Sequence, residues 1–132
     1  MPLFRKKQEV NVATYRADPT EIDPKTSEDY IKRGYAYHAR KEFTKADADL
    51  QQAVSLDATS PEAYYALGLN LKALERKDEA IKAFQKSLEL IPTLEEQNIV
   101  RAHMLTRITK GHINQLVKGD WDLRTEFWSK EA

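Results

Sequence analysis

The chain has 132 residues, a length typical of one domain, and 41% of them are hydrophobic while 32% are charged. Lys plus Arg and Asp plus Glu number 21 each, so the formal net charge is zero and no global field favours nucleic acid or an anionic membrane. The absence of cysteine excludes disulfides, thiolate metal sites and a cysteine nucleophile. This composition predicts an ordered, helix-rich protein.

The segment 1–26 contains prolines at positions 2, 19 and 24 and shows no sustained helical period. We expect it to be extended and mobile. Its first residues, MPLFRKK, lack the apolar core of a signal peptide, and no stretch of the chain approaches the roughly 20 apolar residues that cross a bilayer. These features predict a cytoplasmic protein without a transmembrane segment.

Helix start signals recur along the rest of the chain. At each of them a side-chain oxygen precedes a helical pattern and can accept from the free N–H groups of the first turn. The predicted starts are marked by Thr26, Thr44, Ser60, Asp78 and Thr93. No segment alternates with period 2, so the predicted fold class is all-α.

Two consecutive helix pairs repeat each other 34 positions apart, the distance from Gly34 to Gly68. The matching positions carry an aromatic residue, a glycine, an alanine and large apolar residues. The pairs are Tyr30 with Tyr64, Gly34 with Gly68, Ala46 with Ala80, Leu50 with Phe84, and Leu56 with Leu90. Small residues at the glycine and alanine positions allow two helix axes to approach to about 8–10 Å.

This period and order of residue types resemble the tetratricopeptide repeat. The second copy carries the family pattern as Tyr64, Leu67, Gly68, Leu71, Ala80, Phe84 and Pro92. The first copy departs from it at Arg33, where Leu is usual, and at Ala58, where Pro is usual. The resemblance covers about half of the chain. It implies an α-solenoid of antiparallel helix-turn-helix repeats, with regular repeats at 27–60 and 61–92.

The pattern is looser in the last part of the chain. Apolar residues there suit one long amphipathic helix that tolerates Gly111, and the alternative is two shorter helices with a break at that glycine. Gly119 is expected to end the long helix, and a last helix with Trp121 and Trp128 follows. We interpret 93–132 as a divergent third hairpin that caps the open end of the stack.

Residues that could take part in catalysis or metal binding are not spaced so as to form a site. The three histidines, His38, His103 and His112, lack the spacing that binds a metal from one helix, and carboxylates lie where first turns use them. Each lone glycine lies within a helical pattern, so no phosphate-binding loop is expected. We predict that the protein is not an enzyme and has no cofactor and no metal site.

The resemblance also implies a concave groove lined by the first helix of each repeat. It places eight residues there: Ile31, Tyr35, His38, Tyr65, Leu69, Lys72, Ile99 and His103. Because the middle of this groove is apolar, we predict a non-catalytic scaffold that binds an apolar peptide or helix of a protein partner. The alternative is that these side chains pack between neighbouring first helices.

The sequence also bears on two other function classes. A homo-oligomeric assembly protein would have its groove filled by its own N-terminal segment or by a neighbouring molecule. RNA binding would need a basic stripe along the repeats, and the sequence lacks one, so we predict no nucleic-acid partner.

Overall fold

The structure is a computed structural model that describes residues 18–121. Most of the predicted N-terminal segment, together with Trp128, lies outside these residues. The described elements are a short 3-10 helix, η1 (Pro19–Glu21), and the α-helices α2 (Ser27–Ala39), α3 (Phe43–Leu56), α4 (Pro61–Ala73), α5 (Lys77–Glu95) and α6 (Ile99–Lys118). No strand occurs between residues 18 and 121, in agreement with the predicted all-α class.

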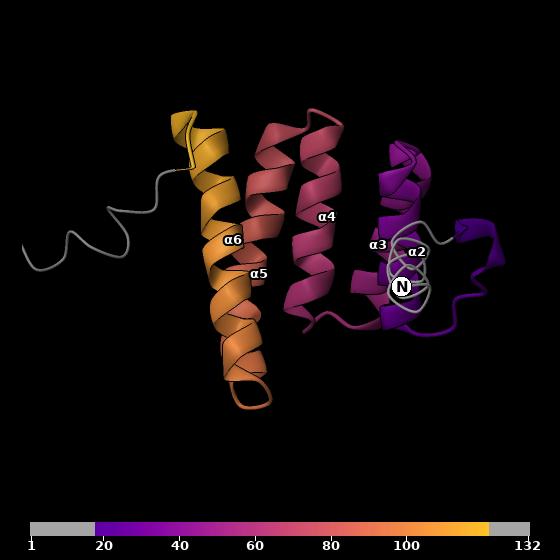
Figure 1. The fold of residues 1–132 in the computed structure, drawn as a ribbon, viewed down its shortest axis with the longest axis horizontal. Coiled ribbons are helices and arrows are strands. Elements are labelled where there is room, and N and C mark those ends of the chain that lie inside the picture. The colour runs from indigo at the N-terminus through magenta and orange to yellow at the C-terminus, as the bar shows by residue number, and fades with distance from the viewer. Residues whose placement is uncertain (1–17, 122–132) are drawn as a thin grey trace, which may run out of the picture.

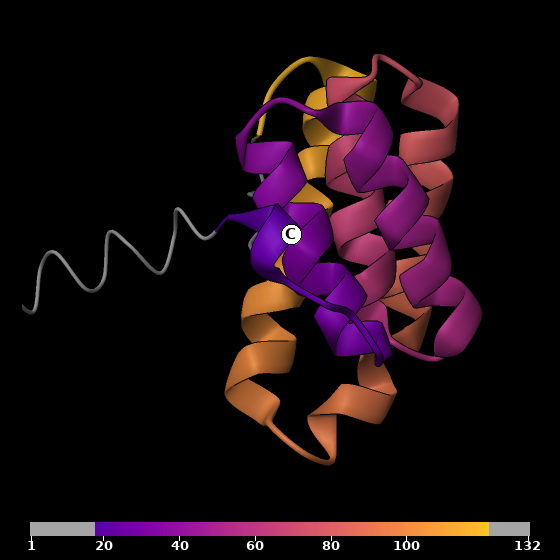
Figure 2. The same ribbon diagram turned by 90° about the vertical axis from the view of Figure 1, so that its right-hand side faces the viewer.

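The helices form two hairpins and then a further helix. Helix α2 packs on α3, α4 packs on α5, and α6 packs on α5. Figure 1 shows the helices side by side, from α2 and α3 at one end to α6 at the other. Figure 2 views the stack from the end that carries η1 and α2. The first helices α2 and α4 also contact each other, as expected for a solenoid of stacked repeats.

Glycine permits the close crossing of the two helices in each hairpin. A Cβ added at Gly34 would lie 2.7 Å from Leu50 Cδ2, and one added at Gly68 would lie 2.6 Å from Phe84 Cδ1. Both contacts are too short for carbon atoms, so a side chain at either position would push the helices apart. The repeated glycine of the sequence therefore sets the spacing inside both hairpins.

The same turn joins the helices of both hairpins. Lys41 and Glu75 lie at equivalent positions and adopt left-handed backbone angles, with φ of 62° and 61°. In the first turn the Glu42 N–H donates to the Tyr37 carbonyl at 2.9 Å, and the equivalent bond recurs in the second. Backbone bonding thus reproduces the turn although neither left-handed residue is a glycine.

In both hairpins a hydroxyl group links the start of the first helix to the later turns of the second. The Ser27 hydroxyl donates to the Ala53 carbonyl at 2.9 Å, and the Ser87 hydroxyl donates to the Pro61 carbonyl at 2.7 Å. Ser27 is equivalent to Pro61 and Ala53 to Ser87, so donor and acceptor have changed places between the repeats. The equivalent bond forms in both repeats because either helix can supply the hydroxyl.

Two of the predicted helix starts are confirmed. The Thr26 hydroxyl accepts from the Asp29 N–H, and the Asp29 carboxylate accepts from the Thr26 N–H, which completes a capping box. The Ser60 hydroxyl accepts from the Ala63 N–H in the same way. These caps fix the first turns of α2 and α4.

The predicted starts at Thr44 and Asp78 are wrong. Helix α3 follows Glu42 and α5 follows Arg76, and neither residue makes a side-chain cap. The physical reason is the tight turn, whose left-handed residue leads directly into the next helix and leaves no extended N-cap residue.

The predicted start at Thr93 is also wrong. Helix α5 continues through Pro92 to Glu95, and α6 begins only after Asn98, whose side chain accepts from the Arg101 N–H at 3.0 Å. The start of α6 is therefore four residues later than a 34-residue period from Pro61 would place it. This displacement changes which side chains α6 presents.

Helix α6 is continuous through Gly111, as the single-helix interpretation predicts. It ends at Gly119, a left-handed residue with φ of 85° that takes the expected C-terminal position. Among the described helices, none combines the length and the hydropathy of a membrane span.

Candidate interaction surface

Side chains from α2 and from the first turns of α4 and α6 lie close together on one surface. Tyr35 of α2 is 39% exposed. Desolvation is the main cause that raises the pKa of Tyr35, and the nearby Tyr65 and Glu62 of α4 add to it. Glu62 in turn forms an ion pair with Arg101 of α6. The Tyr35 ring is thus the accessible apolar part of a surface to which three helices contribute.

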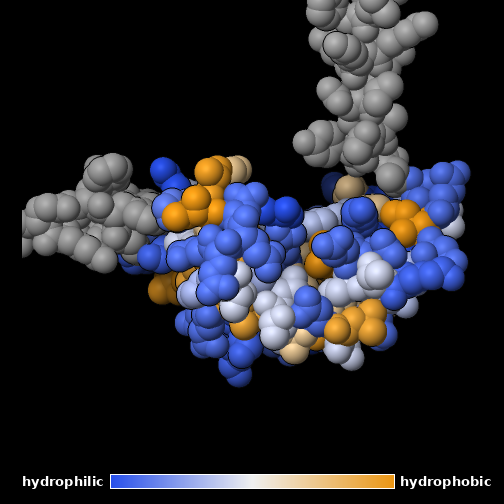
Figure 3. Space-filling view, turned by 90° about the horizontal axis from the view of Figure 1, so that it is seen from below, coloured by the Kyte–Doolittle hydropathy of each residue, from blue (hydrophilic) through white to orange (hydrophobic). Residues whose placement is uncertain are grey.

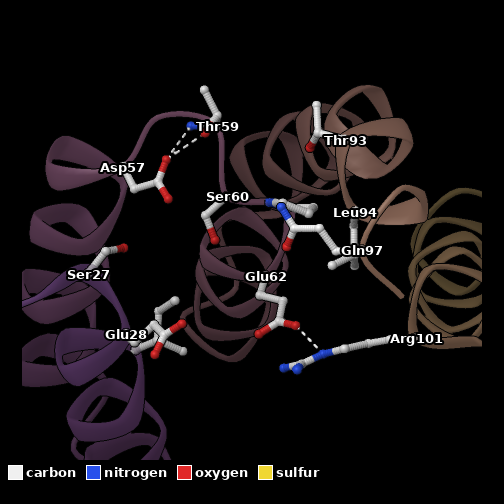
Figure 4. A pocket seen from close by; sticks show the side chains of 12 residues that line it. Ser27, Glu28, Asp57, Thr59, Ser60, Glu62, Thr93, Leu94, Gln97 and Arg101 are labelled. Atoms are coloured by element: carbon white, nitrogen blue, oxygen red, sulfur yellow. Dashed lines mark hydrogen bonds and ion pairs between the residues drawn. The ribbon is translucent and has the colours of Figure 1, made fainter. Parts of the chain in front are cut away.

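A pocket of about 300 Å³ lies beside this ion pair. Its walls come from the starts of α2, α4 and α6, from the end of α5, and from the α3–α4 and α5–α6 connections. They include Ser27, Glu28, Ile31, Glu62, Leu94 and Arg101. Figure 4 shows Glu62 and Arg101 pointing toward each other across it, and Asp57 turned toward Thr59. Because Asp57 accepts from the Thr59 N–H and hydroxyl, its carboxylate is committed to the connection between α3 and α4.

Farther along α6, His112 links this helix to α4. Lys72 Nζ lies 3.2 Å from His112 Nδ1, and Tyr65 Oη lies 3.2 Å from His112 Nε2. An ammonium group only donates, so Nδ1 accepts and Nε2 donates to the tyrosine oxygen. Burial, together with the charge of Lys72, lowers the pKa of His112 to about 4. The ring is therefore neutral, and it joins two side chains of α4 to α6.

Aromatic rings surround the same histidine. The His112 ring stacks on Phe84 with centroids 5.2 Å apart, and Trp121 meets it edge-on at 4.7 Å. Trp121 also lies against Gly111, where the ring leaves no room for a Cβ. We call Tyr65, Lys72, Phe84, His112 and Trp121 the His112 cluster. This cluster fills the C-terminal half of the contact with the chain's own side chains.

The eight predicted groove residues occupy three kinds of position. Ile31 is buried in the core, and Leu69 is half-buried against it. His38 and the buried Asn70 join α2 to α4 at 3.1 Å, while Tyr65 and Lys72 belong to the His112 cluster. The exposed residues are Tyr35, Ile99 and His103. The other five are buried or half-buried among the chain's own side chains.

The sequence places Val100, Met104 and Ile108 in the apolar line of the predicted long helix but does not predict that they are exposed. Val100 and Met104 are 66% and 63% exposed, and Ile108 follows one turn later at 37%. A strict 34-residue register hides this line, because α6 starts four residues late; Asn98, a strong N-cap residue, is the signal that could have located that start. We call Val100, Met104 and Ile108 the α6 ridge. In Figure 3 the face seen from below has separate hydrophobic patches, one of them at the α6 end.

Two protein-family models match the repeated part of the chain. One described as a TPR repeat matches residues 34–75, and one described as a tetratricopeptide repeat matches residues 61–94. Residues 34–94 therefore consist of tetratricopeptide repeats. Repeats of this family generally mediate protein–protein interaction and are typically non-catalytic, and α6 lies beyond both matched ranges. Between residues 18 and 121, no group of three or more His, Cys, Asp or Glu side chains is arranged to hold a metal ion.

Proposed function

We propose that this chain is a non-catalytic interaction module that binds an apolar peptide or helix on the surface shared by α2, α4 and α6. The observation that carries the proposal is the exposure of Tyr35 beside the ion pair of Glu62 and Arg101. A partly exposed tyrosine ring provides contact area at a small cost in side-chain entropy. The neighbouring charges orient the polar groups of the ligand.

The pocket next to the ion pair of Glu62 and Arg101 defines how such a ligand lies. A volume of about 300 Å³ accommodates one side chain of a peptide, and the lining includes the apolar Ile31 and Leu94. The lining also includes Glu28, Glu62 and Arg101, so it offers both signs of charge. We therefore expect one apolar anchor residue in the pocket and polar neighbours on either side.

The His112 cluster limits the ligand to the other half of the surface. Tyr65 and Lys72 are hydrogen-bonded to His112, and Trp121 packs against Gly111. A peptide that displaced them would have to break these hydrogen bonds and expose a stacked pair of rings. The open half, toward the first turns of α2 and α4, is the favoured place for binding.

The test is a peptide selection followed by mapping. Random peptides of about 12 residues are selected against the immobilised full chain, and the best binder is titrated into ¹⁵N-labelled protein. Tyr35→Ala is expected to weaken binding by about tenfold or more, since exposed aromatic anchors commonly carry that much of the affinity. Leu56→Ala is the matched control, because Leu56 is also an exposed large apolar residue but lies on α3.

Two results would contradict the proposal. One is that shift changes cluster away from α2 and α4. The other is that Tyr35→Ala and Leu56→Ala weaken binding equally. Thermal unfolding of both variants accompanies the titrations, so that a loss of binding is not mistaken for a loss of folding.

A further inference from the structure

The α6 ridge has the geometry of a surface that receives a helix. Val100, Met104 and Ile108 are spaced four residues apart, so their side chains follow one line along α6. The line is about 12 Å long at the helical rise of 1.5 Å per residue, which is two turns of a partner helix. Ile99 lies exposed at the same end of α6. Several exposed apolar residues on one line of a helix mark an interaction site more often than an isolated exposed residue does.

Charge distinguishes α6 from the rest of the chain. The whole chain has zero formal charge, but α6 contains four basic residues and no Asp or Glu; these are Arg101, Arg107, Lys110 and Lys118. Arg101 lies between the ridge residues Val100 and Met104 in the chain and pairs with Glu62 of α4. Counting Lys, Arg, Asp and Glu, α6 therefore carries a formal charge of +4 although the whole chain is neutral.

We infer that the α6 ridge docks an acidic amphipathic helix of a partner protein. Apolar side chains of that helix, spaced three or four residues apart, pack on Val100, Met104 and Ile108, while its Asp and Glu residues face the basic side chains of α6. This inference rests on the proposed function in one respect, namely that the chain is an interaction module. It adds the chemistry of the partner and a second place of contact.

Charge also argues against two other occupants of the ridge. A second copy that packed α6 against α6 would bring two helices with four basic residues each, and no acidic ones, into contact. The segment 1–17 has the same sign, because it contains Arg5, Lys6, Lys7 and Arg16 against Glu9 alone. An acidic helix is the complementary choice.

The experiment uses the full chain and two synthetic helical peptides of about 18 residues. One has leucines at positions spaced three and four apart with Glu elsewhere, and the other has Lys in place of every Glu. Fluorescence anisotropy measures binding at about 0.05 M and 0.5 M salt. The Glu peptide is expected to bind at least about tenfold more tightly than the Lys peptide, and its affinity should fall as salt increases.

Substitutions locate the contact. Met104→Glu introduces a like charge into the ridge and is expected to weaken the Glu peptide by about tenfold or more. Leu56→Glu makes the same change at an exposed leucine of α3 and is expected to leave binding unchanged. The urea midpoints of both variants should match that of the unsubstituted chain, as for exposed sites.

Several outcomes would overturn the inference. Equal binding of the two peptides would contradict a preference for an acidic helix. Equal effects of the two substitutions would show that the peptide does not bind at the α6 ridge. A dimer that Met104→Glu dissociates would make a second copy the occupant. Weak peptide binding together with a large loss of stability in Met104→Glu would show that the chain covers its own ridge. None of these results affects the proposed function, whose test depends on Tyr35.

Discussion

Arg33 of α2 and Asp49 of α3 form a two-point ion pair, with Nε 2.8 Å from Oδ2 and Nη2 2.7 Å from Oδ1. Asp49 is only 5% exposed. The equivalent positions of the second repeat carry Leu67 and Ala83, which are both buried apolar residues. The departure of the first repeat at Arg33 is therefore matched by an acidic residue on the facing helix. An ion pair in the first repeat thus occupies the positions that an apolar pair occupies in the second.

This correspondence predicts a non-additive pair of substitutions. Arg33→Leu alone leaves the buried Asp49 carboxylate without its partner and should lower the free energy of unfolding by about 3 kcal/mol. The double variant Arg33→Leu/Asp49→Ala copies the second repeat and should lie within about 1 kcal/mol of the original chain. Urea unfolding measures both. Equal losses in the single and double variants would show that the apolar pair cannot replace the ionic one at this position.

Protonation of His112 should destabilise the fold. The pKa of His112 is lowered to about 4 in the folded chain, from an ordinary value near 6.5, by burial and by the charge of Lys72. The unfolded chain thus takes up a proton at this residue at a higher pH than the folded chain does. The free energy of unfolding is therefore expected to fall as the pH drops from about 6.5 to about 4, with no further change from this group below that.

The variant His112→Phe isolates this effect. It keeps a ring against Phe84 but has no group that titrates, so its unfolding free energy should vary less with pH than that of the original chain between about 6.5 and 5. Urea midpoints at several pH values give the difference between the two curves. Parallel curves would mean that His112 does not titrate differently in the folded and unfolded chains.

Gly111→Ala should displace Trp121, because the new methyl group would occupy the space of the indole ring. In an exposed helix this substitution normally stabilises by about 1 kcal/mol. Here we expect no gain, together with a red shift of tryptophan emission in a Trp128→Phe background, where Trp121 is the remaining tryptophan. Val117→Ala, at an exposed position of the same helix, is expected to leave the emission unchanged. An unshifted spectrum with a full gain in stability would contradict the packing of Trp121 on Gly111.

The sequence by itself determined the two hairpins. Their signals are local or strictly periodic: the capping residues Thr26 and Ser60, and the glycines at Gly34 and Gly68 that recur with the facing large residues. Such signals act within a helix turn or between helices that are adjacent along the chain, so a pattern of spacing is enough to identify them. The single helix through Gly111 and its end at Gly119 were predictable for the same reason.

Only the tertiary structure decided which groove residues remain accessible. Tyr65 and His112 are 47 positions apart, and nothing in the spacing of either helix indicates that they bond. Helix α6 starts four residues late because α5 continues past Pro92. Val100 and Met104 are exposed, although their equivalents 34 positions earlier, Ala66 and Asn70, are buried. Accessibility depends on which side chains meet across helices from different repeats. Such contacts exist only in the folded stack of helices, whereas the repeat is visible in the spacing of residues along the chain.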